Sequence, residues 1–414
     1  MRIAVIGSGI AGLGSAWLLS RAHEVVLFEQ CDYLGGHTHT HNVEIEGLRY
    51  AIDTGFIVFC PLHYPLLTRM FDELGVASQP TTMSFSVQNA RNGLEYNTNN
   101  LRGVFCQGRN LLSVEFWRML AGVVRFYRAA PTLLAEDAPD ITLGEYLRRE
   151  NYSARFRDEH LVPMAAALWS SSSEQILEFP LRHLLQFMAT HDMLQLSGRP
   201  QWRVVKGGSQ SYVRALQKNW RVETRLACSV QRVRRESGAV SIETAQGSER
   251  FDHVVLACHG DQALRLLADA DDAERGILGA MRYQDNEVVL HTDARLLPSR
   301  RKAWAAWNAY IPAQREARCT ASYCMNILQT LDCAQPIMVT LNRGANIDPA
   351  KILWRGTYAH PLQTLASSAA QKRKREIQGR RNTWFAGAYW GFGFHEDGMR
   401  SGVEVANALG VDWP

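Results

Sequence analysis

The sequence predicts an α/β protein, and three observations near its start carry that prediction. An apolar, strand-like run at Ile3–Ile6 leads directly into the glycine-rich segment 7–12, which reads Gly-Ser-Gly-Ile-Ala-Gly. A helical pattern follows to about Leu19, and a second apolar run, Val25–Phe28, ends at the acidic residue Glu29. This βαβ order, with G-x-G-x-x-G at the first strand-to-helix turn, predicts a Rossmann-type dinucleotide-binding domain.

Each part of this motif has a physical reason. Gly7 permits a tight turn, Gly9 lets the backbone approach a pyrophosphate, and Gly12 lets helix and strand pack closely. The free N–H groups and the positive dipole end of the helix that follows would face the phosphates. Glu29, 20 residues after Gly9, can accept hydrogen bonds from both ribose hydroxyls and would repel a 2′-phosphate.

Two further glycine-rich segments belong to the same predicted domain. Leu34-Gly35-Gly36-His37 follows Glu29 and would let a second loop close over the pyrophosphate. Much later, 383–387 is strand-like, 391–398 is rich in glycine, and a helix is predicted from Gly398 to about Leu409 on apolar residues at helical spacing. A domain that binds only NAD needs no such distant return of the chain.

On these motifs the chain resembles the flavin-containing amine oxidase and phytoene desaturase superfamily. The resemblance implies a Rossmann-type, glutathione-reductase-like domain that binds FAD, with its last helix directed at the pyrimidine edge of the flavin. It also implies the cofactor-binding residues, which are Gly7, Gly9, Ile10, Ala11, Gly12, Glu29, Gln30, Gly35, Gly36, His37, Thr54, Gly55, Phe56, Val230, Gly387, Asp397, Gly398 and Met399.

The domain organisation is predicted to be discontinuous. Residues 1–80, 202–267 and 376–414 would form the FAD-binding domain, because they hold the glycine motifs and the strand patterns that accompany them. Residues 81–201 and 268–375 would form an α+β substrate domain. The aromatic and methionine residues of 161–202 fit either core packing or the lining of a site for a long apolar substrate.

Three residues are predicted to carry the chemistry. His360 and His395 lie where flavin amine oxidases place the aromatic residues that frame the substrate, and each fits a base, a hydrogen-bond donor or a core histidine with a reference pKa near ~6.5. Some relatives carry a cysteine beside the first position to bind FAD covalently. Ala359 stands there, so non-covalent FAD is expected. Asn286 stands where amine oxidases usually have a lysine, which argues against classical amine oxidation.

Composition limits the other classes of function. The net charge of +4 and the lack of a basic helix interleaved with aromatics argue against a nucleic-acid partner. The eight cysteines show no C-x-x-C pair and read as reduced thiols in a cytoplasmic protein without a membrane span. His37, His39 and His41 alternate along one predicted strand, but no carboxylate or cysteine accompanies them locally, which argues against a metal site. The resemblance places His37 where relatives often carry an arginine beside the pyrophosphate, so cofactor contact is expected for His37.

A basic run precedes the last strand. It comprises Lys372, Arg373, Lys374, Arg375, Arg380 and Arg381. One interpretation is a solvated helix face. The other is contact with anionic lipid head groups, which would make the protein membrane-peripheral.

Most of the chain resembles one bacterial subgroup of the superfamily. Its marks include Trp169-Ser170, Gln201-Trp202, Lys206-Gly207-Gly208, His360-Pro361 and the segment 393–398. Such proteins are often encoded beside cyclopropane-fatty-acid synthases, and one is implicated as a desaturase in furan fatty acid synthesis. The implied function is an FAD-dependent oxidoreductase that takes hydride from a fatty-acyl-like substrate. The alternatives are a flavin amine oxidase, a carotenoid- or porphyrinogen-type dehydrogenase, and a flavin-binding partner subunit of a lipid methyltransferase.

Overall fold

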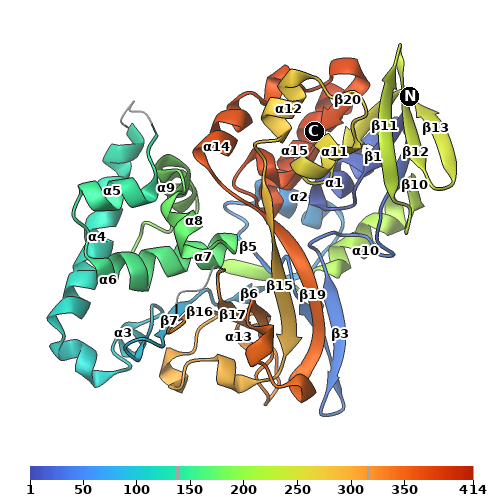
Figure 1. The fold of residues 1–414 in the computed structure, drawn as a ribbon. Helices are drawn as coiled ribbons and strands as arrows, with labels where there is room; N and C mark the ends of the chain where they lie inside the picture. Colours follow the sequence, from blue (N-terminus) through green and yellow to red (C-terminus); the bar gives the residue numbers. More distant parts are fainter. Residues whose placement is uncertain (136–139, 315–317, 414) are drawn as a thin grey trace.

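Two sheets organise the chain, one parallel and one mixed. The computed structural model describes residues 1–135, 140–314 and 318–413. Figure 1 shows the parallel sheet and its helices on one side of the molecule, the long strands β15 and β19 in the middle, and the helices α4 to α9 on the opposite side.

The parallel sheet is the predicted Rossmann unit. Its order is β10 (Val222–Arg225), β2 (Glu24–Phe28), β1 (Arg2–Ile6), β14 (His253–Leu256) and β20 (Thr383–Phe385), and every pair of neighbours is parallel. Its strands are apolar because both faces are covered. On one face Ile3 and Val5 pack with α1 (Ile10–Leu19), α2 (Pro65–Glu73), α10 (Gln210–Asn219) and α15 (His395–Ala408).

The other face of this sheet is covered by segments from the middle of the chain. Ala4 and Ile6 pack there with β11 (Val230–Glu236), β12 (Ala239–Thr244), β13 (Gly247–Phe251), α11 (Gly260–Leu266) and α12 (Asp272–Leu278). Ala370 of α14 (Leu365–Lys372) joins the same cluster. Thus α12 and α14, which lie in segments that the sequence assigned to the substrate domain, pack on the Rossmann side.

Helices α1 and α15 lie against each other along glycines. A Cβ on Gly398 would stand 2.6 Å from Ile10 Cγ2, and one on Gly402 would stand 2.7 Å from the carbonyl oxygen of Ala11. Helix α15 begins at His395, not at Gly398 as predicted, because the carboxylate of Asp397 caps the backbone at its first turn. Residue 398 therefore lies within the helix, where the absence of a side chain allows the close contact.

The mixed sheet is the frame of the second layer. Its order is β19 (Ile352–Pro361), β15 (Tyr283–His291), β18 (Met338–Leu341), β17 (Ala321–Cys324), β16 (Trp307–Ile311), β7 (Phe85–Asn89) and β8 (Leu94–Asn97). All neighbours are antiparallel except β16 and β7. The helices beside it are α4 (Val114–Ala135), α5 (Leu143–Arg149), α6 (Ala154–Phe156), α7 (Val162–Trp169), α8 (Ser173–Leu177) and α9 (Leu181–Thr190). The hairpin β3 (Thr40–Ile45) and β4 (Leu48–Asp53) and the small sheet β5 (Val58–Phe59), β9 (Trp202–Val205) and β6 (Ser78–Thr81) join the two halves.

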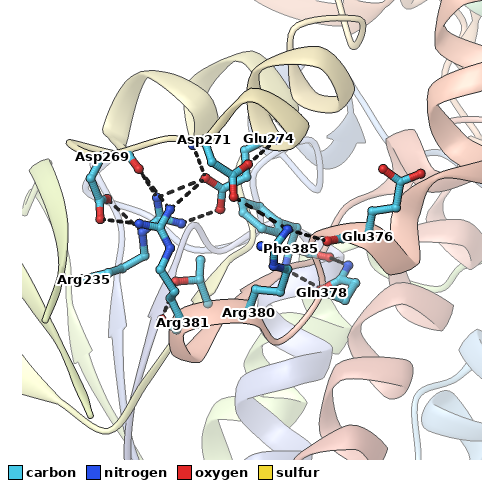
Figure 2. Close-up of polar contacts among 10 residues, drawn as sticks. Arg235, Asp269, Asp271, Glu274, Glu376, Gln378, Arg380, Arg381 and Phe385 are labelled. Atoms are coloured by element: carbon cyan, nitrogen blue, oxygen red, sulfur yellow. Dashed lines mark hydrogen bonds and ion pairs between the residues drawn. The ribbon is translucent and has the colours of Figure 1, made fainter. Parts of the chain in front are cut away.

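Most cations of the basic run form ion pairs within the protein. Figure 2 shows Arg381 beside Asp269 and Glu274, with Arg235 reaching the same two acids and Arg380 facing Asp271. Arg235 has a fully buried side chain, so it needs these carboxylates. The pairs Arg373–Glu376 and Lys374–Glu404 involve two more cations of the run. Most of its charge thus has a structural partner.

Two further features bear on the environment of the protein. Within the ranges that the structure describes, none of the helices combines the length and apolar composition that a bilayer span requires. All eight cysteines are unpaired.

Candidate active site

A cavity of about 1020 Å³ runs between the two halves of the molecule. It is lined at one end by the glycine-rich turn after β1 and at the other by residues of the α4–α9 layer, such as Tyr127 and Met164. Of the predicted site residues, the lining includes Gly7, Gly9, Ile10, Ala11, Glu29, Gln30, Gly35, Gly36, His37, Thr54, Gly55, Phe56, Val230, Gly387, His360 and His395. The fold therefore gathers most of the predicted residues around one space.

The glycine-rich turn is shaped to leave room for a phosphate. Gly7 has φ +100°, and a Cβ there would stand 2.8 Å from the carbonyl oxygen of Ala257. A Cβ on Gly9 would meet no atom within 4 Å, so the space in front of this residue is open. Gly36 backs the same turn, since its own Cβ would stand 3.1 Å from Gly9 Cα. The N-terminus of α1 opens onto this space and favours an anion there.

Glu29 is held by the backbone of the turn it faces. Its Oε2 accepts hydrogen bonds from the Ser8 N–H at 2.8 Å and the Ser8 hydroxyl at 2.6 Å, and its Oε1 accepts one from the Cys31 N–H at 2.9 Å. A carboxylate has about four lone-pair sites. Three are used by the chain, so one remains free for a ribose hydroxyl, and contact with both hydroxyls would require the Ser8 hydroxyl to turn away from Glu29.

His37 lies in the cavity with an unsatisfied atom. Its Nε2 is buried and has no hydrogen-bond partner, while its ring lies 5.5 Å from that of His360 and 5.1 Å from that of Tyr358. Burial lowers the pKa of His37, so the ring is neutral near pH 7. The two histidines that alternate with it pack against each other at 4.1 Å between ring centroids, with His39 also stacked on Tyr33 and His41 against Trp354.

Four predicted cofactor residues do not line the cavity. Gly12 and Gly398 lie in the contact between α1, α15 and the turn, where a Cβ on Gly12 would overlap the carbonyl of Gly7. Met399 is fully buried in the core against Gly14. The carboxylate of Asp397 accepts hydrogen bonds from the Phe392 and Phe394 N–H groups at 3.0 and 3.1 Å. These residues shape the site from behind it.

His360 is oriented by a chain of amides behind it. The Glu287 N–H donates to Asn342 Oδ1 at 3.0 Å, which leaves the Asn342 amide nitrogen to donate to Asn286 Oδ1 at 2.8 Å. The Asn286 amide nitrogen therefore donates to His360 Nδ1 at 3.0 Å. A neutral imidazole that accepts at Nδ1 carries its proton on Nε2. Asn286 itself is fully buried and lies outside the cavity lining, so it positions His360 rather than facing the cavity.

His395 is fixed by stacking and by two hydroxyls. Its ring lies parallel to that of Phe56 at 3.6 Å, and its Nε2 is 3.0 Å from the Thr38 hydroxyl and 3.4 Å from the Tyr212 hydroxyl. Burial lowers the pKa of His395 to about 3. Burial and the neighbouring His37 and His259 do the same for His360. Neither histidine therefore titrates near neutrality, which corrects the expectation drawn from the reference pKa.

The far part of the cavity is lined mainly by apolar side chains, although Asp192 and Arg199 also belong to the lining, and we call its apolar part the apolar chamber. It is formed by Ile57, Val58, Met83, Phe85, Met164, Leu168, Phe187, Met193, Trp202, Trp307, Tyr323, Leu341 and Phe394. Of the aromatic and methionine residues singled out in 161–202, Met164, Phe187, Met193 and Trp202 line it, whereas Trp169, Phe179 and Met188 are core residues. His160 and His191 also line the cavity, with their pKa lowered to about 4 by burial.

The comparisons with known proteins decide the family. The family model of flavin containing amine oxidoreductases matches residues 10–296. The chain belongs to this family. It is therefore a flavin-dependent oxidoreductase with FAD as its cofactor, and the open turn at Gly9, the remaining lone pair of Glu29 and the unpartnered Nε2 of His37 fit that cofactor.

Solved structures share the fold over nearly the whole chain. The CLA-producing fatty acid isomerase from P. acnes is 19% identical, with a TM-score of 0.70 over 99% of both chains. Cyclohexylamine oxidase from Brevibacterium oxydans IH-35A is 16% identical, with a TM-score of 0.66 over 99% of this chain and 98% of that one. Among curated sequences, the uncharacterized protein MJ1488 of Methanocaldococcus jannaschii is 41% identical over 61 residues, which are 15% of this chain and only 14% of that protein.

Several residues of this flavoenzyme site were not found from the sequence. Ser8, Thr38, Tyr212 and Asn342 hold Glu29, His395 and Asn286 in place through contacts between distant segments. Ser8 lies inside the glycine motif, and its position opposite the acid that ends β2 could have signalled the bond. The other three have no signal in local spacing. Within the described residues no cluster of three or more histidine, cysteine, aspartate or glutamate side chains could hold a metal ion.

Proposed function

We propose that this flavoenzyme takes hydride from an apolar, fatty-acyl-like chain, as a desaturase or dehydrogenase does. The apolar chamber is the observation that carries the proposal, because burial of a long methylene chain there would be favoured by about 0.8 kcal/mol per CH₂ group. The fatty acid isomerase from P. acnes, a neighbour in fold, is by its name an enzyme that acts on fatty acids.

The charge state of the site supports this proposal. Six histidines line the cavity, namely His37, His160, His191, His259, His360 and His395, and burial lowers the pKa of each. These histidines are therefore neutral, and the charged residues of the cavity lining are Glu29, Asp192, Asp285, Arg199 and Arg265. Asn286 stands where amine oxidases usually have a lysine, and an asparagine carries no charged amine. Its amide is occupied by hydrogen bonds with His360 and Asn342.

The proposed reaction assigns different roles to the two histidines. Forming a carbon–carbon double bond removes hydride from one carbon and a proton from its neighbour, and bound FAD supplies the acceptor for the electron pair. His360 presents Nε2–H and has Nδ1 occupied, so it is suited to donate a hydrogen bond and not to take the proton. His395 remains the predicted base, but with a pKa lowered to about 3 it would hold the proton only transiently and pass it to the bonded hydroxyls of Thr38 and Tyr212.

The test is anaerobic mixing of the FAD-loaded protein with two sets of compounds. We expect saturated or unsaturated fatty acyl compounds to bleach the visible flavin band, with a product that has lost two hydrogen atoms by mass spectrometry. Primary, secondary and polyamines should leave the band unchanged. Rapid bleaching by an amine would favour the amine oxidase alternative. No bleaching by any compound, together with co-purification of a lipid methyltransferase, would favour the partner-subunit alternative.

A further inference from the structure

A patch of exposed apolar side chains lies far from the FAD-binding end. Leu101, Leu111, Leu112, Val114 and Trp117 form it, and we call it the apolar patch. Leu112 is 89% exposed, Leu101 76% and Val114 64%. Among the described residues, five of the twelve exposed large hydrophobic side chains fall in this short segment, so they are clustered and not scattered as exposed apolar residues usually are.

The apolar patch is built on ordered structure. It spans α3 (Leu101–Val104), the 3-10 helix η1 (Gly108–Leu112) and the first turn of α4. The Asn100 side chain caps α3, and the indole N–H of Trp117 donates to the carbonyl of Leu111 at 2.9 Å. Phe116, beneath the patch, is fully buried. The exposed side chains are thus presented by folded backbone, at the edge of the molecule where Figure 1 shows α3 and the lower end of α4.

Basic residues surround the apolar patch. Arg102, Arg109 and Arg118 alternate with it along the chain, and all three are exposed. The exposed Arg301 and Lys302 lie on η4 (Arg301–Ala303), which packs against α3. The one acid in the segment, Glu115, lies 3.5 Å from Arg155. The rim therefore carries a positive charge around an apolar centre.

We propose that the apolar patch and its basic rim dock this enzyme on an anionic lipid bilayer. Apolar side chains that enter the head-group boundary, surrounded by cations that meet anionic lipids, are the two signals that interfacial binding needs. A second copy of the chain fits less well, because a two-fold contact would bring the arginines of both rims together. The basic run before β20, by contrast, is largely ion-paired within the protein.

The apolar patch adjoins the cavity along the chain. Thr98, three residues before Leu101, and Tyr127 of α4 both line the cavity. The docked enzyme would therefore hold its apolar chamber next to the source of an acyl chain. This last step rests on the proposed function, whereas docking itself does not.

The test is co-sedimentation with vesicles of phosphatidylcholine, with and without phosphatidylglycerol, using the FAD-loaded full chain. We expect L111S/L112S to lower binding to the phosphatidylglycerol vesicles by at least about tenfold. R102E/R118E should lower it by a similar factor, about tenfold or more, by removing attraction to the anionic lipid. FAD content and thermal unfolding of each variant show that it is folded.

Two matched controls separate this patch from the rest of the surface. L48S changes a leucine that is 59% exposed at the turn between β3 and β4, and K372E/R375E changes exposed cations of the basic run. Both should bind vesicles like the parent. The proposal is overturned if the parent does not bind anionic vesicles, if the patch variants bind as well as the parent, or if only K372E/R375E loses binding. It is also overturned if L111S/L112S dissociates a dimer without changing vesicle binding. Turnover enters none of these readouts, so failure of the proposed function leaves the result intact.

Discussion

Replacing Glu29 by alanine separates its contribution to FAD binding from its contribution to folding. Three of its lone pairs are occupied by Ser8 and Cys31, and one is left for the cofactor. One hydrogen bond to a charged group contributes about 1.5–3 kcal/mol, so the Kd for FAD should rise roughly 10- to 150-fold. A larger loss would mean that the turn itself has collapsed.

The same replacement leaves the Ser8 N–H without its acceptor in the folded protein. Ser8 is fully buried, so an unsatisfied donor there should lower the free energy of unfolding by about 1–3 kcal/mol. This is less than the ~5–15 kcal/mol of a typical domain, so the variant should still fold.

The assay is titration of the FAD-free protein with FAD by calorimetry, together with urea unfolding in the absence of FAD. The matched control is E24A at the start of β2, the strand that Glu29 follows; the carboxylate of Glu24 is exposed and pairs with Arg2, and its removal should leave the Kd unchanged. If E29A lowers stability but binds FAD like the parent, Glu29 serves the fold alone and the assignment of the motif is refuted.

Three further predictions concern buried charge and protonation. E274A should lower the free energy of unfolding by about 3–5 kcal/mol in urea titrations, because it strips the fully buried Arg235 of a carboxylate. Buried His160, His191, His360 and His395 have a pKa below that of the unfolded chain, so protons bind the unfolded state preferentially below pH ~6.5. Stability should therefore be constant above that pH and fall below it, by up to about 1.4 kcal/mol per pH unit for each histidine, in urea titrations from pH 7.5 to 5. N286D places a carboxylate at His360 and should raise the pKa of that imidazole by about 1–3 units. The pH profile of substrate-dependent flavin reduction should then show a titration that the parent lacks. Identical pH profiles would exclude the amide chain as the structure that orients His360.

The Rossmann unit was predictable because its signals are local. Each signal depends only on the residues that form the element: the run Ile3–Ile6, the glycine segment 7–12 and the acid after Val25–Phe28. The structure has β1, α1 and β2 where these patterns predict them. The start of α15 was predicted at Gly398 and not at His395, because the glycines at 391–398 favour a turn and the cap made by Asp397 has no clear pattern among them.

The supports of the site could not be predicted in this way. Asn342 and Asn286 meet because β15 and β18 are neighbours in the mixed sheet, and Tyr212 reaches His395 because α10 and α15 cover the same face. The lowered pKa of both predicted histidines follows from burial, which depends on tertiary packing. Residue type alone identified His360 and His395 as candidate site residues, but it did not predict that both are neutral at pH 7.

The glycine contact between α1 and α15 has a consequence for biosynthesis. The phosphate-binding helix is complete by Leu19, yet the surface it leans on is provided by Gly398 and Gly402. During translation one side of α1 therefore stays uncovered after the early βαβ unit has been made. It is covered only when α15, nearly four hundred residues later in the chain, has left the ribosome. Contacts between such distant segments form late in folding. We expect nascent chains stalled before residue 395 to emerge without stable flavin and to depend on holdase chaperones, and FAD loading to be a post-translational event.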